Sequence, residues 1–246
     1  MLELVFYGIV FGSIIALGAI GLTLVFGIIR FANFAHGDLM STGAYLALFM
    51  VTGLLSWIGV PDTTFGSLSF GLRMLIAFPV SMSIVGCLAI AVDRILYRKL
   101  RKNKSSAVML AISSLGVAFI LRMLILIFWG ADSMFYRPGL MRLAIDFPLG
   151  IKIRPDQILI IILVFGLVAL LHLYMQKTKM GKAMRATADN MELALVSGID
   201  TERVIILTWG IGGALAAAGG ILYGLSLIHI SEPTRLLRRS RMPSSA

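Results

Sequence analysis

Long apolar runs separated by short polar segments dominate this sequence. A helix needs about 20 apolar residues to cross a hydrocarbon layer about 30 Å thick. The runs that meet this length cover Leu4 to Ile29, the stretch after Arg30 to about Ile58, Leu72 to about Val92, Ala107 to about Trp129, about Asp156 to Gln176, and the region from Val204 onward. The pattern therefore predicts an all-α polytopic membrane protein with about six transmembrane helices.

Small residues recur within two of these runs. Gly8, Gly12 and Ala16 are spaced four apart in the first run, which predicts a face for close helix packing. The last run holds the densest set of small residues, from Gly210 to Gly220, and is predicted to occupy a buried position.

Composition supports a membrane protein. Of 246 residues, 59% are hydrophobic and 14% charged, and the mean hydropathy is +0.94, far from soluble composition. The net charge of +10 is carried between the apolar runs and at the C-terminus, so we attribute it to topology and not to nucleic-acid binding. The single cysteine, Cys87, lies in an apolar run and supports neither a disulfide framework nor a cysteine metal site.

The basic residues predict an orientation. The densest internal cluster lies in one connection and comprises Arg94, Arg98, Lys99, Arg101, Lys102 and Lys104. The positive-inside rule places this connection in the cytoplasm. Counting spans outward from it puts the N-terminus and the Gly130 to Pro155 loop outside, and the connections at Arg30 and at Lys177 inside.

The connection from Lys177 to Arg203 is the longest charged and helix-forming interior stretch, and we expect a short helix in it. A stripe of mostly small or flexible residues follows helical spacing along one side: Met180, Met184, Thr187, Met191, Ala194 and Gly198. This pattern is equally compatible with a solvated connecting helix and with a helix that docks on a partner.

Three polar residues follow the first run. Asn33, His36 and Asp38 are too few to indicate a metal site or a catalytic pair. We favour capping of the next helix by Asn33 or Asp38, with Asp38 also stabilised by the helix dipole. The alternative is a role in gating near the cytoplasmic end of a solute pathway.

The fourth run carries two polar features. Ser113, Ser114 and Gly116 either expose hydroxyl and backbone groups to a polar solute or allow close helix packing. Arg122 either extends its long side chain to the external interface or takes part in a pathway.

Catalysis finds no support in the sequence. No Ser/His/Asp set or paired carboxylates suggest a hydrolase, and no GxxxxGK[ST] loop could bind a nucleotide. A permease driven by a separate ATPase fits these features. A secondary carrier or channel, which would need intramembrane charges or inverted repeats, and a structural scaffold remain as alternatives.

The C-terminal segment differs in character from the rest of the chain. LSLIHISEPTR, from Leu225 to Arg235, resembles the translation of a transposon-end adapter used in sequencing libraries. We therefore expect residues 1–224 to form the permease domain and residues 225–246 to be a non-native tail.

Four stretches carry a family resemblance. They are GLTLVFGIIRFANFAHGDLMSTGAY, AISSLGVAFILR, KTKMGKAMRATADNMELALVSGID and GGALAAAGGILYG, and they resemble the branched-chain amino acid ABC permease family of the LivH type over about Met1 to Gly224. ABC importers carry an EAAxxxG-like element that contacts the ATPase; Glu192, Ala194 and Gly198 match it, whereas Leu193 departs. The resemblance implies an ATPase-coupling loop that includes Gly181, Arg185, Glu192, Ala194 and Gly198.

The resemblance also implies a non-enzymatic transport subunit in the bacterial plasma (inner) membrane. Its expected partners are a paralogous second permease, two ATPase subunits that hold ATP and Mg, a periplasmic binding protein and the lipid bilayer, with no cofactor on this chain. Leucine, isoleucine or valine is the expected solute, with urea, amides or other amino acids as alternatives. Members of the family usually continue with further spans.

Overall fold

A computed structural model describes residues 2–61, 63, 70–132, 134, 136, 145–147 and 151–227. The helices are α1 (Leu2–Ile29), α2 (His36–Leu48), α3 (Leu55–Trp57), α4 (Leu72–Val92), α5 (Arg98–Lys102), α6 (Ala107–Trp129), α7 (Pro155–Lys177), α8 (Lys179–Asp189), α9 (Met191–Val196) and α10 (Thr201–Leu227). Two π-helical stretches, η1 (Phe49–Leu54) and η2 (Asp93–Tyr97), continue α2 and α4. A small antiparallel hairpin pairs β1 (Ile145–Phe147) with β2 (Ile151–Ile153).

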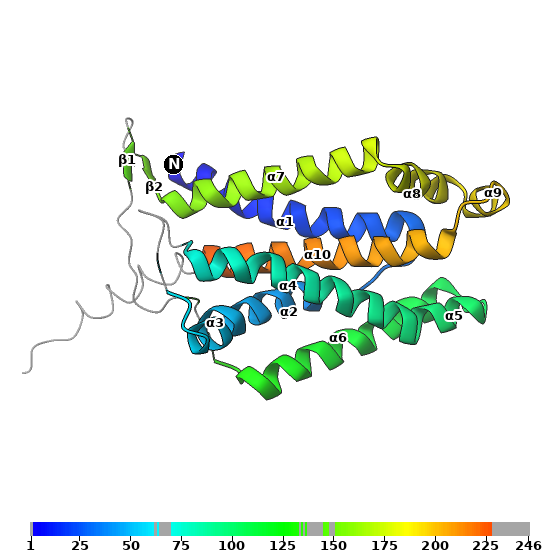
Figure 1. Ribbon diagram of the computed structural model, residues 1–246, viewed down its shortest axis with the longest axis horizontal. Helices are drawn as coiled ribbons and strands as arrows, with labels where there is room; N and C mark the ends of the chain where they lie inside the picture. The colour runs from blue at the N-terminus through cyan, green and yellow to red at the C-terminus, as the bar shows by residue number, and fades with distance from the viewer. Residues whose placement is uncertain are drawn as a thin grey trace, which may run out of the picture.

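Six of the helical segments in the described part are long and apolar enough to cross a membrane. They run side by side, with α7 along α1 on one side of the bundle and α6 beside α2 on the other (Figure 1). The prediction of an all-α polytopic protein with about six spans is confirmed. The helix α10 ends at Leu227, and residues 228–246 lie outside the described residues, so the boundary at Gly224 stays a prediction.

The helix α10 is the most buried of the six spans and packs against α1, α2 and α4. Its small residues allow this packing: a Cβ added at Gly43 of α2 would lie 2.5 Å from the Cα atom of Ala217, and one added at Gly220 would overlap the main chain of Met40. The predicted buried position of this glycine- and alanine-rich span is confirmed.

The expected packing face of the first span, Gly8, Gly12 and Ala16, is not covered by another helix of the described residues. Gly8 and Gly12 are exposed, and a Cβ added at either would meet no atom of the described residues within 4 Å. The close packing of α1 lies further along the helix, where a Cβ added at Gly18 would come within 2.9 Å of Met40 and one at Gly21 within 3.0 Å of the Gly212 carbonyl oxygen. Small residues thus give tight packing only where a neighbouring helix of the described residues faces them.

The connection between α1 and α2 turns back into the bundle. Arg30 ends α1 with a left-handed backbone (φ 60°), and residues 31–35 are not helical. His36 Nε2 then lies 2.9 Å from the carbonyl oxygen of Gly18, about three turns or roughly 16 Å before the end of α1. The helix α2 therefore begins inside the bundle, and Figure 1 shows the connection running back from the end of α1. We name residues 30–35 the re-entrant segment.

We expect Gly220→Ala to destabilise the bundle, because the added methyl group would overlap the main chain of Met40. Overpacking of this kind costs about 1–3 kcal/mol. Thermal unfolding of the purified protein in detergent measures the effect. Gly166→Ala on α7 is the control, since its Cβ would meet nothing within 4 Å. Equal melting temperatures for the two variants would contradict the packing described.

Candidate functional site

Polar groups from α1, α2, α6 and the re-entrant segment meet inside the bundle. Ser114 on α6 accepts a hydrogen bond from the Phe34 amide through its Oγ atom (3.0 Å). Arg122 Nε donates to Asp38 Oδ1 (3.1 Å), and His36 bonds the main chain of α1. Together with Asn33, we call these residues the intramembrane polar cluster. The sequence analysis named Asn33, His36, Asp38, Ser114 and Arg122, but assigned them unrelated roles in the first connection and in the fourth run.

Neither Asn33 nor Asp38 caps α2, so the capping interpretation is wrong. The N-cap residue is Ala35, and no side chain bonds the first amides of the helix. Asn33 Oδ1 instead accepts a hydrogen bond from the amide of Ala35 (3.2 Å), the residue before the first residue of α2. Asp38 does lie in the first turn, where the helix dipole favours it, but its bonded partner is Arg122. The gating role proposed for Asn33, His36 and Asp38 stays a prediction.

Asn33 also brings an unused donor into the cluster. The residue is 4% exposed, and among the described residues its Nδ2 atom has no hydrogen-bond partner. A buried amide donor without a partner is costly, so it marks a place where another polar group could be accommodated.

The Arg122 side chain points away from the nearer end of α6, at Trp129. Side chains of a helix tilt towards its N-terminal end, and the N-terminal end of α6 faces the charged connection that contains α5. The guanidinium accordingly reaches Asp38 at the start of α2, although 61% of the Arg122 side chain is exposed. A charged side chain in this position needs a polar or protein environment.

Ser113 and Gly116 do not join the cluster. Ser113 Oγ donates to the Met109 carbonyl of its own helix (2.8 Å), and a Cβ added at Gly116 would meet nothing within 4 Å among the described residues. Of the three residues predicted for the pathway, the structure thus brings only Ser114 to the re-entrant segment. The pathway role of all three stays a prediction.

The charged connection after α7 forms two helices and not the single short helix expected. Thr178 caps α8 by accepting from the Gly181 amide (2.9 Å), and Asn190 ends α8 and caps α9 by accepting from the amides of Glu192 and Leu193. Gly198 then takes a left-handed conformation (φ 82°), which closes α9 and favours glycine. Local capping chemistry at Asn190 overrides the continuous helix propensity.

Only part of the predicted stripe faces the protein itself: Met184, Thr187 and Ala194 are buried, whereas Met191 and Gly198 are exposed. Gly181 is also buried, and a Cβ added there would overlap the backbone at the end of α7. The surface available to a partner is therefore a different one. We call it the α9 surface; its apolar members, 61–86% exposed, are Leu193, Leu195 and Val196. Glu192 of α9 and Arg185 of α8 are also exposed.

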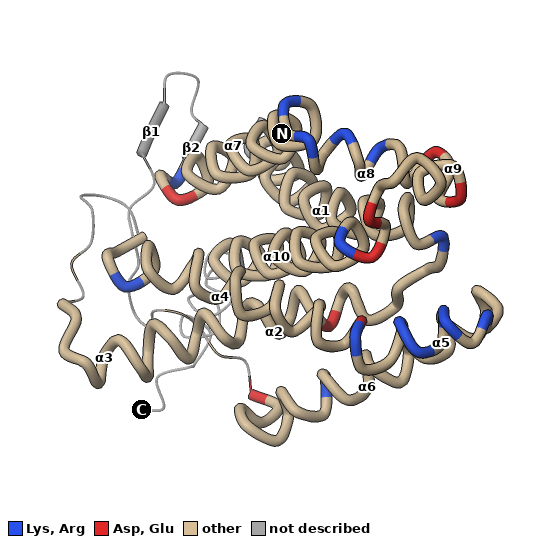
Figure 2. The backbone as a smooth tube through the Cα atoms, turned by 45° about the vertical axis from the view of Figure 1, so that its right-hand side comes forward, with Lys and Arg blue, Asp and Glu red and all other residues tan. Residues whose placement is uncertain are grey.

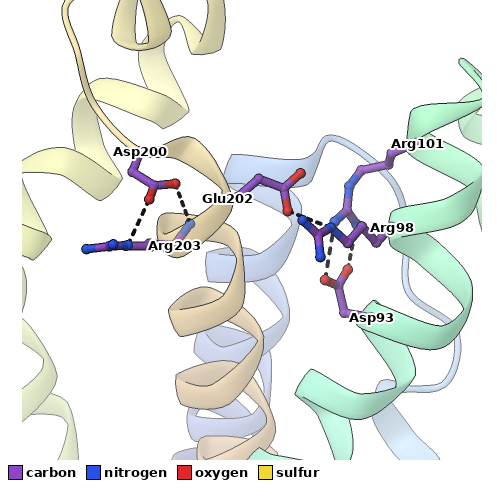
Figure 3. Close-up of polar contacts among 6 residues, drawn as sticks. All are labelled: Asp93, Arg98, Arg101, Asp200, Glu202 and Arg203. Atoms are coloured by element: carbon purple, nitrogen blue, oxygen red, sulfur yellow. Dashed lines mark hydrogen bonds and ion pairs between the residues drawn. The ribbon is translucent and has the colours of Figure 1, made fainter.

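A direct hydrogen bond links this connection to the re-entrant segment. Arg30 Nη2 donates to the Ala188 carbonyl in the last turn of α8 (2.6 Å). Figure 2 shows charged residues gathered at the end of the bundle that carries α5, α8 and α9. There Arg98 of α5 pairs with Glu202 at the start of α10 (3.0 Å), and Arg101 holds Asp93 with two bonds (2.6 and 3.2 Å), as Figure 3 shows.

An aromatic group lies between this charged end and the polar cluster. Phe31 of the re-entrant segment packs on Tyr97 (ring centroids 5.2 Å apart), and Tyr97 stacks on Trp209 of α10 (5.0 Å). All three side chains are at most 2% exposed. They fill the bundle at the position where the re-entrant segment begins.

Metal chemistry receives no support from the described residues, which contain no group of three or more His, Cys, Asp or Glu that could hold an ion. Two buried carboxylates, those of Asp38 and Asp93, are instead paired with arginines. The arrangement of an intramembrane polar cluster linked to an exposed helix pair is suited to transport.

Residues 4–236 match the family described as branched-chain amino acid transport system / permease component. The chain belongs to this family. It is 32% identical to the high-affinity branched-chain amino acid transport system permease protein BraD of Pseudomonas aeruginosa, over 89% of this chain and 69% of that protein. The branched-chain amino acid permease protein LivH of Escherichia coli is 32% identical over 91% of this chain and 70% of that protein. A probable LivH of Methanocaldococcus jannaschii is 30% identical over 87% of this chain and 64% of that protein. No solved structure matches the chain.

In this permease we expect Arg101→Gln to destabilise the fold, because it leaves the carboxylate of Asp93, 1% exposed, buried without its partner. Removing one member of a buried pair costs about 3 kcal/mol or more. Arg203→Gln is the control, since Arg203 and Asp200 form an exposed pair (76% and 52%). Thermal unfolding should separate the two variants, and a loss of stability in both or in neither would contradict this assignment.

Proposed function

We propose that this chain is a transmembrane permease subunit of a binding-protein-dependent ABC importer for branched-chain amino acids. The family places it among permease components, and one observation supports coupling to an ATPase: the α9 surface is exposed, while Arg30 ties α8 to the re-entrant segment. Urea, amides or other amino acids are the alternative solutes.

The proposed coupling element is the helix pair α8 and α9. Exposed apolar side chains on a short, capped helix suit insertion into a cleft of another protein. Arg185 and Glu192, which are also exposed, would contact the ATPase subunit. Gly181, Ala194 and Gly198 would act differently, by holding α8 and α9 rigidly against the spans so that movement of the pair is transmitted.

The wider assembly follows from this role. ATP and Mg would bind on two ATPase subunits, a paralogous second permease would complete the membrane part, and a periplasmic binding protein would deliver the solute. The chain would lie in the bacterial plasma (inner) membrane with its N-terminus outside and α8 and α9 in the cytoplasm. It would hold no cofactor and catalyse no reaction itself.

The intramembrane ion pair of Arg122 and Asp38 is the one observation that favours a secondary carrier, because such carriers couple ions through buried charges. Uptake separates the two functions. An importer stops when ATP hydrolysis is blocked and continues when ion gradients are collapsed, whereas a secondary carrier shows the opposite response.

We expect Val196→Asp to detach the ATPase without harming the fold. Val196 is 86% exposed, so a carboxylate there costs the free permease little, but it would place a charge in an apolar contact. Copurification of the ATPase subunits and ATP-driven uptake of leucine should fall about tenfold or more. Val196→Ile, which keeps the apolar contact, is the control. Full copurification with Val196→Asp would exclude the α9 surface as the docking site.

We expect Arg30→Asn to separate ATP hydrolysis from uptake. Asparagine tolerates the left-handed backbone of this position but cannot reach the Ala188 carbonyl. The ATPase would still dock and hydrolyse ATP, while uptake falls several-fold. Lys104→Asn is a matched control, because Lys104 is also basic, exposed and left-handed (φ 52°), yet its side chain has no bonded partner among the described residues. Normal uptake by Arg30→Asn would contradict the link.

A further inference from the structure

One face of the bundle cannot be covered by lipid. The re-entrant segment exposes Ala32 and Phe34, and the start of α2 exposes Gly37 and Ser41. Arg122, with 61% of its side chain exposed, comes from α6 beside them. Irregular backbone and a charged side chain at membrane depth are tolerated only against protein or water. This face, which we call the α2–α6 face, therefore borders a protein partner or a water-filled space.

Two arginine–aspartate pairs in the bundle differ in the number of bonds that join them and in their exposure. Arg101 and Asp93 are joined by two bonds, and their side chains are 17% and 1% exposed. Arg122 and Asp38 share a single bond of 3.1 Å, with side chains 61% and 10% exposed. Among the described residues, both terminal nitrogens of Arg122 and the Oδ2 atom of Asp38 have no further partner. In the first pair both carboxylate oxygens are bonded, whereas in the second pair one carboxylate oxygen and the terminal guanidinium nitrogens are free among the described residues.

Further unused donors surround the second pair. The His36 amide donates to the Asn33 carbonyl (3.3 Å), but the amides of Gly37 and Asp38 and the buried Nδ2 atom of Asn33 have no partner among the described residues. Apolar surface lies beside them, since Phe34 of the re-entrant segment and Phe119 of α6 are 55% and 59% exposed. Charged groups of both signs next to exposed apolar side chains match the chemistry of an apolar amino acid in its zwitterionic form.

We propose that the pair of Arg122 and Asp38 recognises both charges of a zwitterionic amino acid during its passage. The α-carboxylate of the solute would take the terminal nitrogens of Arg122, and its ammonium would take Asp38 Oδ2, while the apolar side chain lies on Phe34 and Phe119. The inference rests on the proposed function, because it requires solute to pass along the α2–α6 face. The bond between Arg122 Nε and Asp38 Oδ1 remains when the solute leaves, so neither charge stays without a partner.

The test compares Asp38→Asn, Arg122→Gln and the double variant in the complete transporter. Each single change removes a charge-assisted bond to the solute, and leucine uptake should fall about tenfold or more. A purely structural pair predicts a different result for the double variant, since removal of both charges leaves none unpaired. Recognition predicts that the double variant regains normal membrane levels and thermal stability but not uptake. Recovery of uptake in the double variant would overturn the proposal.

ATP hydrolysis by the same variants keeps this proposal separate from the proposed function. The docking surface at α9 is unchanged, so each variant should copurify with its ATPase subunits and retain basal ATP hydrolysis. If the unmodified protein itself binds no ATPase, the proposed function fails. If it binds ATPase and the double variant takes up leucine normally, only the recognition by Arg122 and Asp38 fails.

Thiol labelling tests whether the solute passes along the α2–α6 face. Ser41→Cys, made in a Cys87→Ser background, places a thiol one turn from Asp38. Phe165→Cys is the control, because Phe165 is 65% exposed on α7 among apolar neighbours. A charged, membrane-impermeant thiol reagent should label the first variant during ATP turnover and not the second, and leucine should slow the labelling. Absence of labelling at Ser41→Cys, or labelling that leucine does not change, would overturn the proposal.

Discussion

The close approach of α10 to its neighbours is the packing on which the other features depend. Backbone contact at Gly43 and Ala217 and at Met40 and Gly220 draws α2 against α10 along its length. A helix that begins inside the bundle loses the water that would otherwise bond its first amides, so it needs tight packing to stay in place. The small residues of α10 supply that packing, and the re-entrant segment exists because α2 is held at this depth.

Held in this way, the re-entrant segment joins two regions of different chemistry. Its first residue, Arg30, is bonded to α8, and its Phe34 amide is bonded to Ser114 of α6. Between them, Phe31 packs at a tilt against Tyr97 and Trp209 in the buried aromatic group. In the proposed importer, a movement of α8 would act on Arg30 first. The aromatic group would have to separate before the polar cluster could open towards the cytoplasm.

Local sequence patterns were sufficient for the spans. The limits expected for the fourth run, Ala107 to Trp129, agree with α6, because apolar length decides whether a helix can cross a bilayer. The third run begins at Leu72 as expected, but its helical span continues beyond Val92 through η2 and α5 to Lys102. The burial of α10 was also predictable from its density of small residues. The orientation of the N-terminus and the roles of the site residues stay predictions.

The candidate site could not be assembled from the sequence, for a physical reason. Phe34 and Ser114 are 80 positions apart and Asp38 and Arg122 are 84 apart, so their contacts depend on how deep α2 begins, which no local signal encodes. A residue in the first turn after a polar connection, such as Asp38, normally lies at the membrane interface, where capping or contact with water explains it. An arginine near the end of a span, such as Arg122, is normally explained by extension of its side chain to the interface. The depth of α2 changes both interpretations together. At a surface, water can replace either partner of an ion pair at little cost. At the depth of α2, Arg122 and Asp38 can separate only if water or another polar group takes the place of the lost partner.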